Sequence, residues 1–127
     1  DKAYTYVQMQ QLKFAAVQEY RQALKEADVL AVPTLPILPP DIGQRQVHFL
    51  GQEQHVRGVL TRLTVPTNFN GLPSLSVPCG FATSGLPVGL QLIGRPFDEA
   101  NLYRVAYAFE QSVSLPTAPI DLPTASQ

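Results

Sequence analysis

The chain has 127 residues, of which 45% are hydrophobic and 15% charged, a composition expected of one globular domain or one part of a larger domain. Its formal net charge of −1 gives no excess of basic residues that would attract nucleic acid or an anionic membrane, so we expect neither as a direct partner. The single cysteine, Cys79, excludes an internal disulfide and a cysteine-rich metal site, and no apolar run approaches the ~20 residues of a membrane span.

The first residues of the chain read DKAYTY, which is not the pattern of a signal peptide. A chain that begins with Asp rather than Met is expected to be a fragment or a processed product. The low charged fraction suggests in addition that much of the surface meets other protein.

Residues 3–27 contain no Gly or Pro and are rich in Ala, Gln, Leu and Glu, which favour helix. Val17, Tyr20, Leu24 and Ala27 recur at spacings of three, four and three, which places them on one face of a helix. We therefore predict an amphipathic helix here.

The run from Val29 to Val32 follows Asp28, is apolar on both faces and stops at Pro33. Such a run is typical of a strand buried on both sides, in a sheet that helices cover. The chain offers few neighbours for a strand of this kind, so we expect residues outside the sequence to complete its sheet.

Residues 34–58 lose periodicity and mix Pro, Gly, Gln and isolated apolar residues, which predicts a long irregular loop. The segment from Val59 to Phe69 is expected to form a short helix. The Val65-Pro66 pair must either break this helix or start it, because proline has no N–H and restricts the residue before it.

Two strands joined by a turn are predicted next, from Ser74 to Val77 and from Val88 to Ile93. Each follows a Gly-Leu-Pro tripeptide, and each alternates between two kinds of side chain. The residues Thr83-Ser84-Gly85 are the expected turn.

A last helix is predicted to begin after Asp98, which would be its N-cap, with Glu99 in the first turn. It is expected to run to about Val113. Its apolar face would consist of Leu102, Val105, Ala106, Phe109 and Val113.

Residues 114–127 contain three prolines and little periodicity, so we expect a folded segment over 1–113 and a surface tail over 114–127. This order of helices and strands predicts the α/β class, with at least three strands.

Side chains that could carry chemistry are few. His48 and His55 flank Glu53, but a metal site needs a third ligand and regular spacing, so solvated loop histidines are the interpretation we favour. Cys79 could be a nucleophile, yet neither histidine is placed near it by the sequence. A buried structural cysteine is the better hypothesis.

The serines and glycines give no known catalytic pattern. There is no Gly-x-Ser-x-Gly around Ser74 or Ser76, and no glycine-rich phosphate loop. Asn68 and Asn70 lie at the junction of a predicted helix and strand, where their amides either satisfy turn backbone groups or face a site. The residues by themselves predict a scaffold without a catalytic constellation.

The stretch TVPTNFNGLPSLSVPCGF, followed by SGLPVGLQLIGRPFDEANLYRVAYAFEQ, resembles the C-terminal part of the amidase signature family, the Ser-Ser-Lys amide hydrolases. The resemblance runs from about Lys13 to Val113 and is nearly free of gaps over residues 64–111. It implies a large α/β domain with a mixed, twisted central sheet and helices on both faces, which is incomplete in this chain.

For the chemistry, the resemblance implies a nucleophilic serine, a cis-peptide serine and a lysine in a Gly/Ser-rich region upstream. No such region is present here and no lysine follows Lys25, so we expect no catalytic residue in this chain, and no metal or cofactor. The chain would supply sheet strands and one wall of the substrate pocket. The candidate substrate-binding residues are Thr61, Thr64, Asn68 and Phe69.

The family includes the A subunit of the tRNA-dependent (glutamyl/aspartyl) amidotransferase. There, an aspartate lies three residues before the Thr of a T-x-P-x-N motif and holds the amino group of the amino-acid substrate. Here the same position is Thr61, in LTRLTVPTN. Losing the carboxylate removes a charge-assisted bond of about 1.5–3 kcal/mol, which favours an amidase with another acyl group. Two alternatives stay open, the C-terminal part of an amidotransferase A subunit or an autonomous non-catalytic binding domain.

The partners implied are the N-terminal part of the same enzyme, which would carry the triad, and a small-molecule amide. A homodimer is a further option. The expected location is the cytoplasm.

Overall fold

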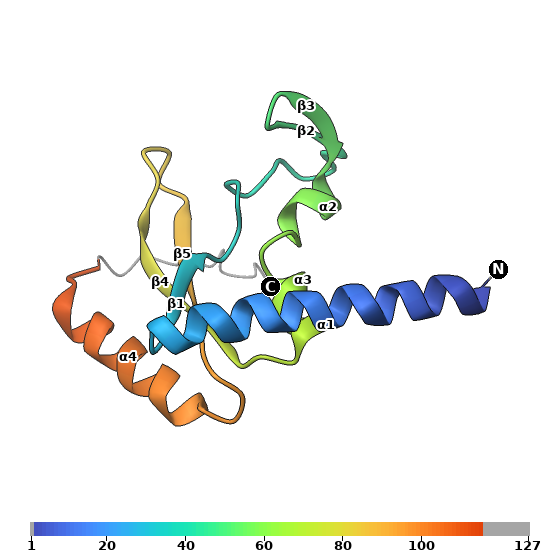
Figure 1. The fold of residues 1–127 in the computed structure, drawn as a ribbon. Helices are drawn as coiled ribbons and strands as arrows, with labels where there is room; N and C mark the ends of the chain where they lie inside the picture. The colour runs from blue at the N-terminus through green and yellow to red at the C-terminus, as the bar shows by residue number, and fades with distance from the viewer. Residues whose placement is uncertain (1, 116–127) are drawn as a thin grey trace, which may run out of the picture.

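The computed structural model describes residues 2–115, and the side chains from Tyr4 onward. The elements follow the order helix, strand, hairpin, two short helices, hairpin, helix (Figure 1). Their bounds are α1 Lys2–Glu26, β1 Leu30–Pro33, β2 Gln46–Phe49, β3 Gln52–His55, α2 Val56–Leu60, α3 Val65–Asn70, β4 Ser74–Phe81, β5 Pro87–Ile93 and α4 Glu99–Ser112. The predicted α/β class is confirmed. The predicted tail over 114–127 lies almost entirely outside the described residues.

The main sheet has the strand order β1-β5-β4, and both pairings are antiparallel. Ile93 at the end of β5 lies opposite Leu30 on one side and Ser74 on the other. The predicted strand pair is confirmed, although β4 continues to Phe81. Between Pro78 and Gly80 the register shifts by one residue, so Cys79 is the extra residue of a β-bulge, and its thiol donates to the Val88 carbonyl at 3.4 Å.

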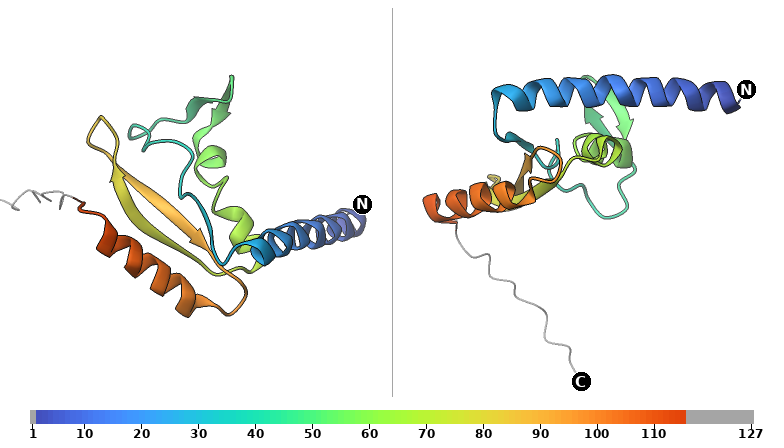
Figure 2. Two further views of the ribbon diagram at one scale, coloured as in Figure 1. Left: turned by 60° about the vertical axis from the view of Figure 1, so that its left-hand side comes forward. Right: turned by 60° about the horizontal axis from the view of Figure 1, so that its bottom comes forward.

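Two apolar clusters hold helices to the two sides of this sheet, and Figure 2 shows α1 and α4 on opposite sides. The α4 side is built on Val77, Leu92, Leu102 and Ala106, with Val105 and Phe109 packed against them. The predicted apolar face of this helix is therefore confirmed except for Val113, which lies beyond its last residue. The α1 side contains Leu24, Leu72 and Ile93 as its buried residues. Ile93 is 2% exposed and is one of the largest fully buried side chains among the described residues.

Gly94 and Arg95, which follow β5, explain how the helices approach the sheet. A Cβ on Gly94 would lie 3.0 Å from Leu102 Cγ, so the absence of a side chain lets α4 come this close. Arg95 Nε donates to the Leu24 carbonyl at 3.0 Å, and Nη2 donates to the Ala27 carbonyl at 3.2 Å and to Asp28 Oδ1 at 3.1 Å. These carbonyls belong to the C-terminal end of α1, where intrahelical donors run out, so Arg95 caps that helix.

Asp98 occupies the N-cap position of α4, but its side chain makes no capping hydrogen bond, which corrects the sequence prediction. Its backbone has φ −108° and ψ 36° rather than the extended conformation that aims a capping side chain at the first turn. The backbone carbonyl of Asp98 accepts from Asn101 and Leu102 instead.

The predicted irregular loop over 34–58 is partly wrong, because β2 and β3 form a two-stranded antiparallel hairpin within it. The turn residues Leu50 and Gly51 both have positive φ, 51° and 80°, as a tight two-residue hairpin turn requires. The hairpin stands apart from the main sheet (Figure 1). The predicted short helix over 59–69 is two helices, and α3 starts at the Val65-Pro66 pair.

The described residues cover the strand β1 only in part, and the expectation that residues outside the sequence complete its sheet stays a prediction. Leu30 and Val32 are half-buried against the α1 cluster, whereas Ala31 and Pro33 are exposed. Within the described residues β1 pairs with β5 alone, so its other edge is open.

The N-terminal half of α1 is also uncovered. Six large apolar side chains on it are at least 50% exposed, namely Tyr4, Tyr6, Val7, Met9, Leu12 and Phe14. Figure 1 shows this half of the helix extending beyond the rest of the fold. Among the described residues, no helix combines the length and apolar character needed to span a bilayer.

Candidate functional site

The four predicted binding residues lie on one short stretch, α2, α3 and the turn between them. Thr61 closes α2 as its C-cap, and Thr64 precedes α3 as its N-cap. Asn68 and Phe69 lie in the second half of α3. The structure thus keeps all four on a single connected stretch, although it brings only some of them into contact.

Threonine hydroxyls fix this stretch through local hydrogen bonds. Thr61 Oγ1 donates to the Arg57 carbonyl at 3.0 Å, and Thr64 Oγ1 donates to the Thr61 carbonyl at 3.3 Å. Thr67 Oγ1 continues the series by donating to the Thr64 carbonyl at 2.9 Å. Each hydroxyl proton is therefore used, while oxygen lone pairs remain to accept a hydrogen bond.

Two contacts tie the stretch to the main sheet, and neither was predicted from the sequence. Gln91 on β5 is 3% exposed, and its Nε2 donates to the Leu63 carbonyl at 3.0 Å. Thr67, 2% exposed, accepts a hydrogen bond of 3.4 Å from Ser74 Oγ on β4. A polar residue in the middle of an otherwise apolar strand, GLQLIG, is the signal that could have revealed Gln91.

Asn68 and Phe69 take no part in the hydrogen bonds of the threonine hydroxyls. The backbone N–H of Asn68 donates to the Thr64 carbonyl at 3.5 Å, and its side chain is exposed. Phe69 is 40% exposed, and Lys13 Nζ from α1 lies 5.6 Å from its ring centroid, within the range of a cation–π contact. Phe69 therefore meets α1 rather than the other predicted binding residues.

Asn70, the last residue of α3, has a buried amide whose nitrogen and oxygen make no hydrogen bond in the described part of the chain. One role expected for Asn68 and Asn70 was to satisfy turn backbone groups. For Asn70 that interpretation is wrong, because the turn after α3 is closed by backbone bonds from Gly71 and Leu72 to the Thr67 carbonyl.

The two histidines have structural roles, as does Cys79 in the β-bulge of β4. His55 Nδ1 accepts from the backbone N–H of Arg57 and caps α2. His48 lies opposite Glu53 in the hairpin with Nδ1 3.5 Å from Oε1, and both side chains are about two-thirds exposed. Among the described residues, no three His, Cys, Asp or Glu side chains gather as a metal site would require.

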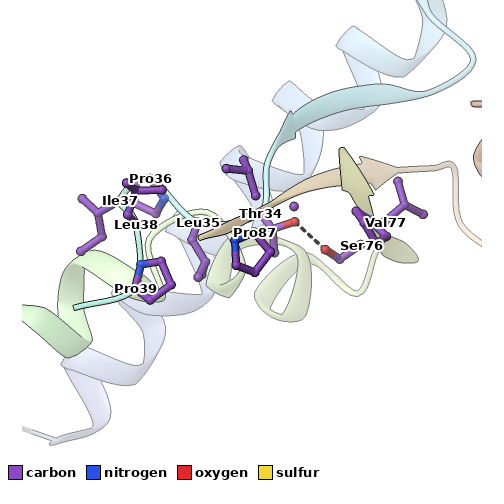
Figure 3. Close-up of a pocket in the computed structure, with 12 residues that line it drawn as sticks. Thr34, Leu35, Pro36, Ile37, Leu38, Pro39, Ser76, Val77 and Pro87 are labelled. Carbon is purple, nitrogen blue, oxygen red and sulfur yellow. Dashed lines mark hydrogen bonds between the residues drawn. The ribbon is translucent and has the colours of Figure 1, made fainter. Parts of the chain in front are cut away.

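A separate apolar pocket of about 530 Å³ lies between the segment after β1 and the β4–β5 hairpin. Its walls are Leu35, Pro36, Ile37, Leu38 and Pro39 on one side and residues 76–78 and 87–89 on the other (Figure 3). Thr34 Oγ1 and Ser76 Oγ lie 2.6 Å apart and form the hydrogen bond drawn there. None of the predicted binding residues lines this pocket.

The sequence profile described as Amidase matches residues 1–103. The A subunit of the glutamyl-tRNA(Gln) amidotransferase of Myxococcus xanthus is 40% identical over 106 residues, which cover 84% of this chain and 21% of that protein. A fatty acid amide hydrolase of Oryza sativa subsp. indica is 42% identical over 107 residues, which cover 84% of this chain and 17% of that protein.

Solved structures agree with these sequence relatives. A bacterial aryl acylamidase of the amidase signature enzymes has a TM-score of 0.70 at 29% identity, covering 81% of this chain and 22% of that one. The A subunit of the glutamyl-tRNA(Gln) amidotransferase of Thermotoga maritima has a TM-score of 0.69 at 30% identity, covering 87% and 23%. The chain spans about a fifth of the length of the curated relatives it matches.

Proposed function

Because this chain belongs to the amidase signature family, we propose that it is the C-terminal portion of an amidase that hydrolyses carbon–nitrogen bonds of amides. The observation that carries the proposal is the family match over residues 1–103, together with the small share of each relative that the chain spans. The part outside that share is the part to which the resemblance assigns the Ser–cis-Ser–Lys triad.

In the proposed reaction, the upstream serine oxygen attacks the amide carbonyl and the amine leaves with a proton, which produces an acyl-enzyme. Water then attacks the acyl carbonyl, the carboxylic acid leaves and the serine regains its proton. Backbone donors upstream would stabilise the developing oxyanion. This chain contributes the strands of the sheet and a substrate wall, a name used here for Thr61, Thr64, Asn68 and Phe69 on α2, α3 and the turn between them.

The test is turnover of simple aliphatic and aryl amides, followed as released amine or ammonia. The enzyme at its natural full length is expected to hydrolyse such amides, and residues 1–127 alone are expected to give no turnover above the uncatalysed rate. Hydrolysis by the pure 127-residue chain would contradict the proposal, because it would place a catalyst within this sequence.

The amidotransferase A subunit is the second candidate, and it is favoured by the identity of 38–41% to several such proteins. Comparing glutamine with aliphatic and aryl amides as substrates of the full-length enzyme separates the two. Preference for glutamine, with dependence on partner proteins, would support the amidotransferase.

Replacing Thr61 with Asp gives a direct test of the substrate wall. The new carboxylate would attract the α-ammonium group of glutamine, so we expect kcat/KM for glutamine, relative to an aryl amide, to rise about 10-fold or more. Loss of the hydroxyl bond to the Arg57 carbonyl should cost only about 1 kcal/mol of stability.

The matched control is Thr83→Asp, which adds the same carboxylate at an exposed residue of the β4–β5 turn. It should leave the ratio of the two substrates unchanged. If Thr61→Asp shifts only the melting temperature, Thr61 is not part of the wall.

A third hypothesis treats the chain as an autonomous binding domain. It is supported by the open edges of β1 and β4 within the described residues, where backbone groups could pair with a strand of another protein. A cooperative thermal transition of the isolated monomer would support it, whereas aggregation would favour the enzyme portion.

The proposal extends to partners and location. The N-terminal part of the same enzyme and a small-molecule amide would be its partners, in the cytoplasm, with neither nucleic acid nor membrane in direct contact. A homodimer is compatible with it, and the mass of the full-length enzyme in solution decides that point.

A further inference from the structure

Gln91 is the polar side chain whose burial calls for an explanation. It lies in the middle of β5, is 3% exposed and is flanked across the sheet by Val32 and Ser76. Burying an amide costs free energy unless it is hydrogen-bonded, and here its Nε2 reaches a carbonyl 28 residues away in sequence. That carbonyl belongs to Leu63, at 3.0 Å.

Leu63 lies in the turn between α2 and α3, two residues after Thr61 and directly before Thr64. In the described part of the chain, its carbonyl receives its hydrogen bond from Gln91 rather than from helical backbone. The other contacts of this region involve α3 and not the turn. Thr67 accepts a hydrogen bond from Ser74, and the ring of Phe69 lies near Lys13 Nζ. Local hydrogen bonds shape the turn, and among the printed contacts of the described residues the bond from Gln91 is the one that joins Leu63 to the sheet.

We propose that Gln91 is a positioning residue that holds Thr61 and Thr64 in place for the substrate. This inference rests on the proposed function, because it assigns Gln91 to the substrate wall. Gln91 touches the turn and not the reacting atoms, so its loss should weaken substrate binding while leaving the chemical step intact.

The first test replaces Gln91 with Met, which is similar in length and has no N–H donor. In the full-length enzyme we expect KM for the amide to rise about 3- to 10-fold at nearly constant kcat, the factor that one hydrogen bond of ordinary strength provides. Hydrogen exchange should accelerate at the backbone amides of residues 61–68 and stay unchanged at β4 and α4.

The second test replaces Gln91 with Glu and varies pH. A carboxyl group buried opposite a carbonyl has a raised pKa, and only its protonated form can donate to Leu63. Neither flanking residue titrates, and the guanidinium of Arg62 lies over the Phe49 ring at 5.4 Å from its centroid. KM of this variant should therefore be close to wild type at low pH and rise as pH passes the raised pKa, unlike that of Gln91→Met.

The matched control is Gln52→Met, which makes the same change at an exposed position of β3 and should alter neither KM nor exchange. Unchanged exchange at residues 61–68 in Gln91→Met would overturn the inference. So would a fall in kcat together with exchange that accelerates throughout the chain, since that indicates a structural role alone. Absence of amide turnover in the wild-type enzyme would instead refute the proposed function, and the exchange data would still decide whether Gln91 holds the turn.

Discussion

Shortening Ile93 to Ala is expected to lower the free energy of unfolding by about 2–5 kcal/mol. Ile93 is 2% exposed and packs with Leu24 of α1 and with Leu72, which leads from α3 into β4. The deletion removes apolar surface from the core and leaves a cavity, and both effects act in the same direction. Urea titration of the wild type and the variant measures the difference.

Ile42→Ala provides a matched control for this result. Ile42 is fully exposed, so the same chemical change there should alter stability by no more than about 0.5 kcal/mol. Equal losses for the two variants would contradict the assignment of Ile93 to the core between α1 and the sheet.

Shortening Leu102 to Ala is the second large effect we expect, again about 2–5 kcal/mol, because this 2% exposed residue anchors α4. Gly94→Ala should cost about 1–3 kcal/mol on its own, since the added methyl group would lie 3.0 Å from Leu102 Cγ. In the double variant the new methyl group occupies part of the space that Leu102 vacates. The combined loss, measured by urea titration, should therefore be smaller than the sum of the two, by about 0.5–3 kcal/mol.

The control for α4 is Leu12→Ala, a leucine of α1 that is 60% exposed. It should leave the stability nearly unchanged. Strict additivity of Gly94→Ala and Leu102→Ala would show that α4 does not approach β5 as closely as the structure indicates.

The parts of the fold that the sequence predicts well are those with strong local patterns. The β4–β5 hairpin follows from alternation bounded by Gly and Pro, and the apolar face of α4 follows from helical spacing. Both patterns can be recognised from the spacing of residues within one element or one hairpin, without knowing which residues they will pack against.

The parts that were wrong depend on weaker signals. The β2–β3 turn uses Leu50 at a positive φ, where Asn or Gly is the usual sign of a hairpin. The apolar run Val29–Val32 indicates burial but does not show which residues provide it, so cover from outside the sequence stays a prediction. Asp98 has the right residue type for a cap, and its backbone angles decide that it does not act as one.

The candidate site shows the same division. Thr61, Thr64, Asn68 and Phe69 are close in sequence, and the structure keeps them on one continuous stretch. Gln91 was missed because its contact with Leu63 exists only once the sheet and the α2–α3 turn are packed together. The local pattern marks Gln91 as a polar residue in an apolar strand, but it does not show which group Gln91 contacts.

Arg95 has a consequence for how the molecule is made. Its guanidinium bonds the carbonyl of Leu24, 71 positions earlier in the chain. At a synthesis rate of about 5–20 residues per second, Arg95 is added to the chain roughly 4–14 s after Leu24. During this interval the guanidinium cannot bond the Leu24 and Ala27 carbonyls, which are left to water. A residue that follows the main sheet thus completes a helix that precedes this sheet in the chain.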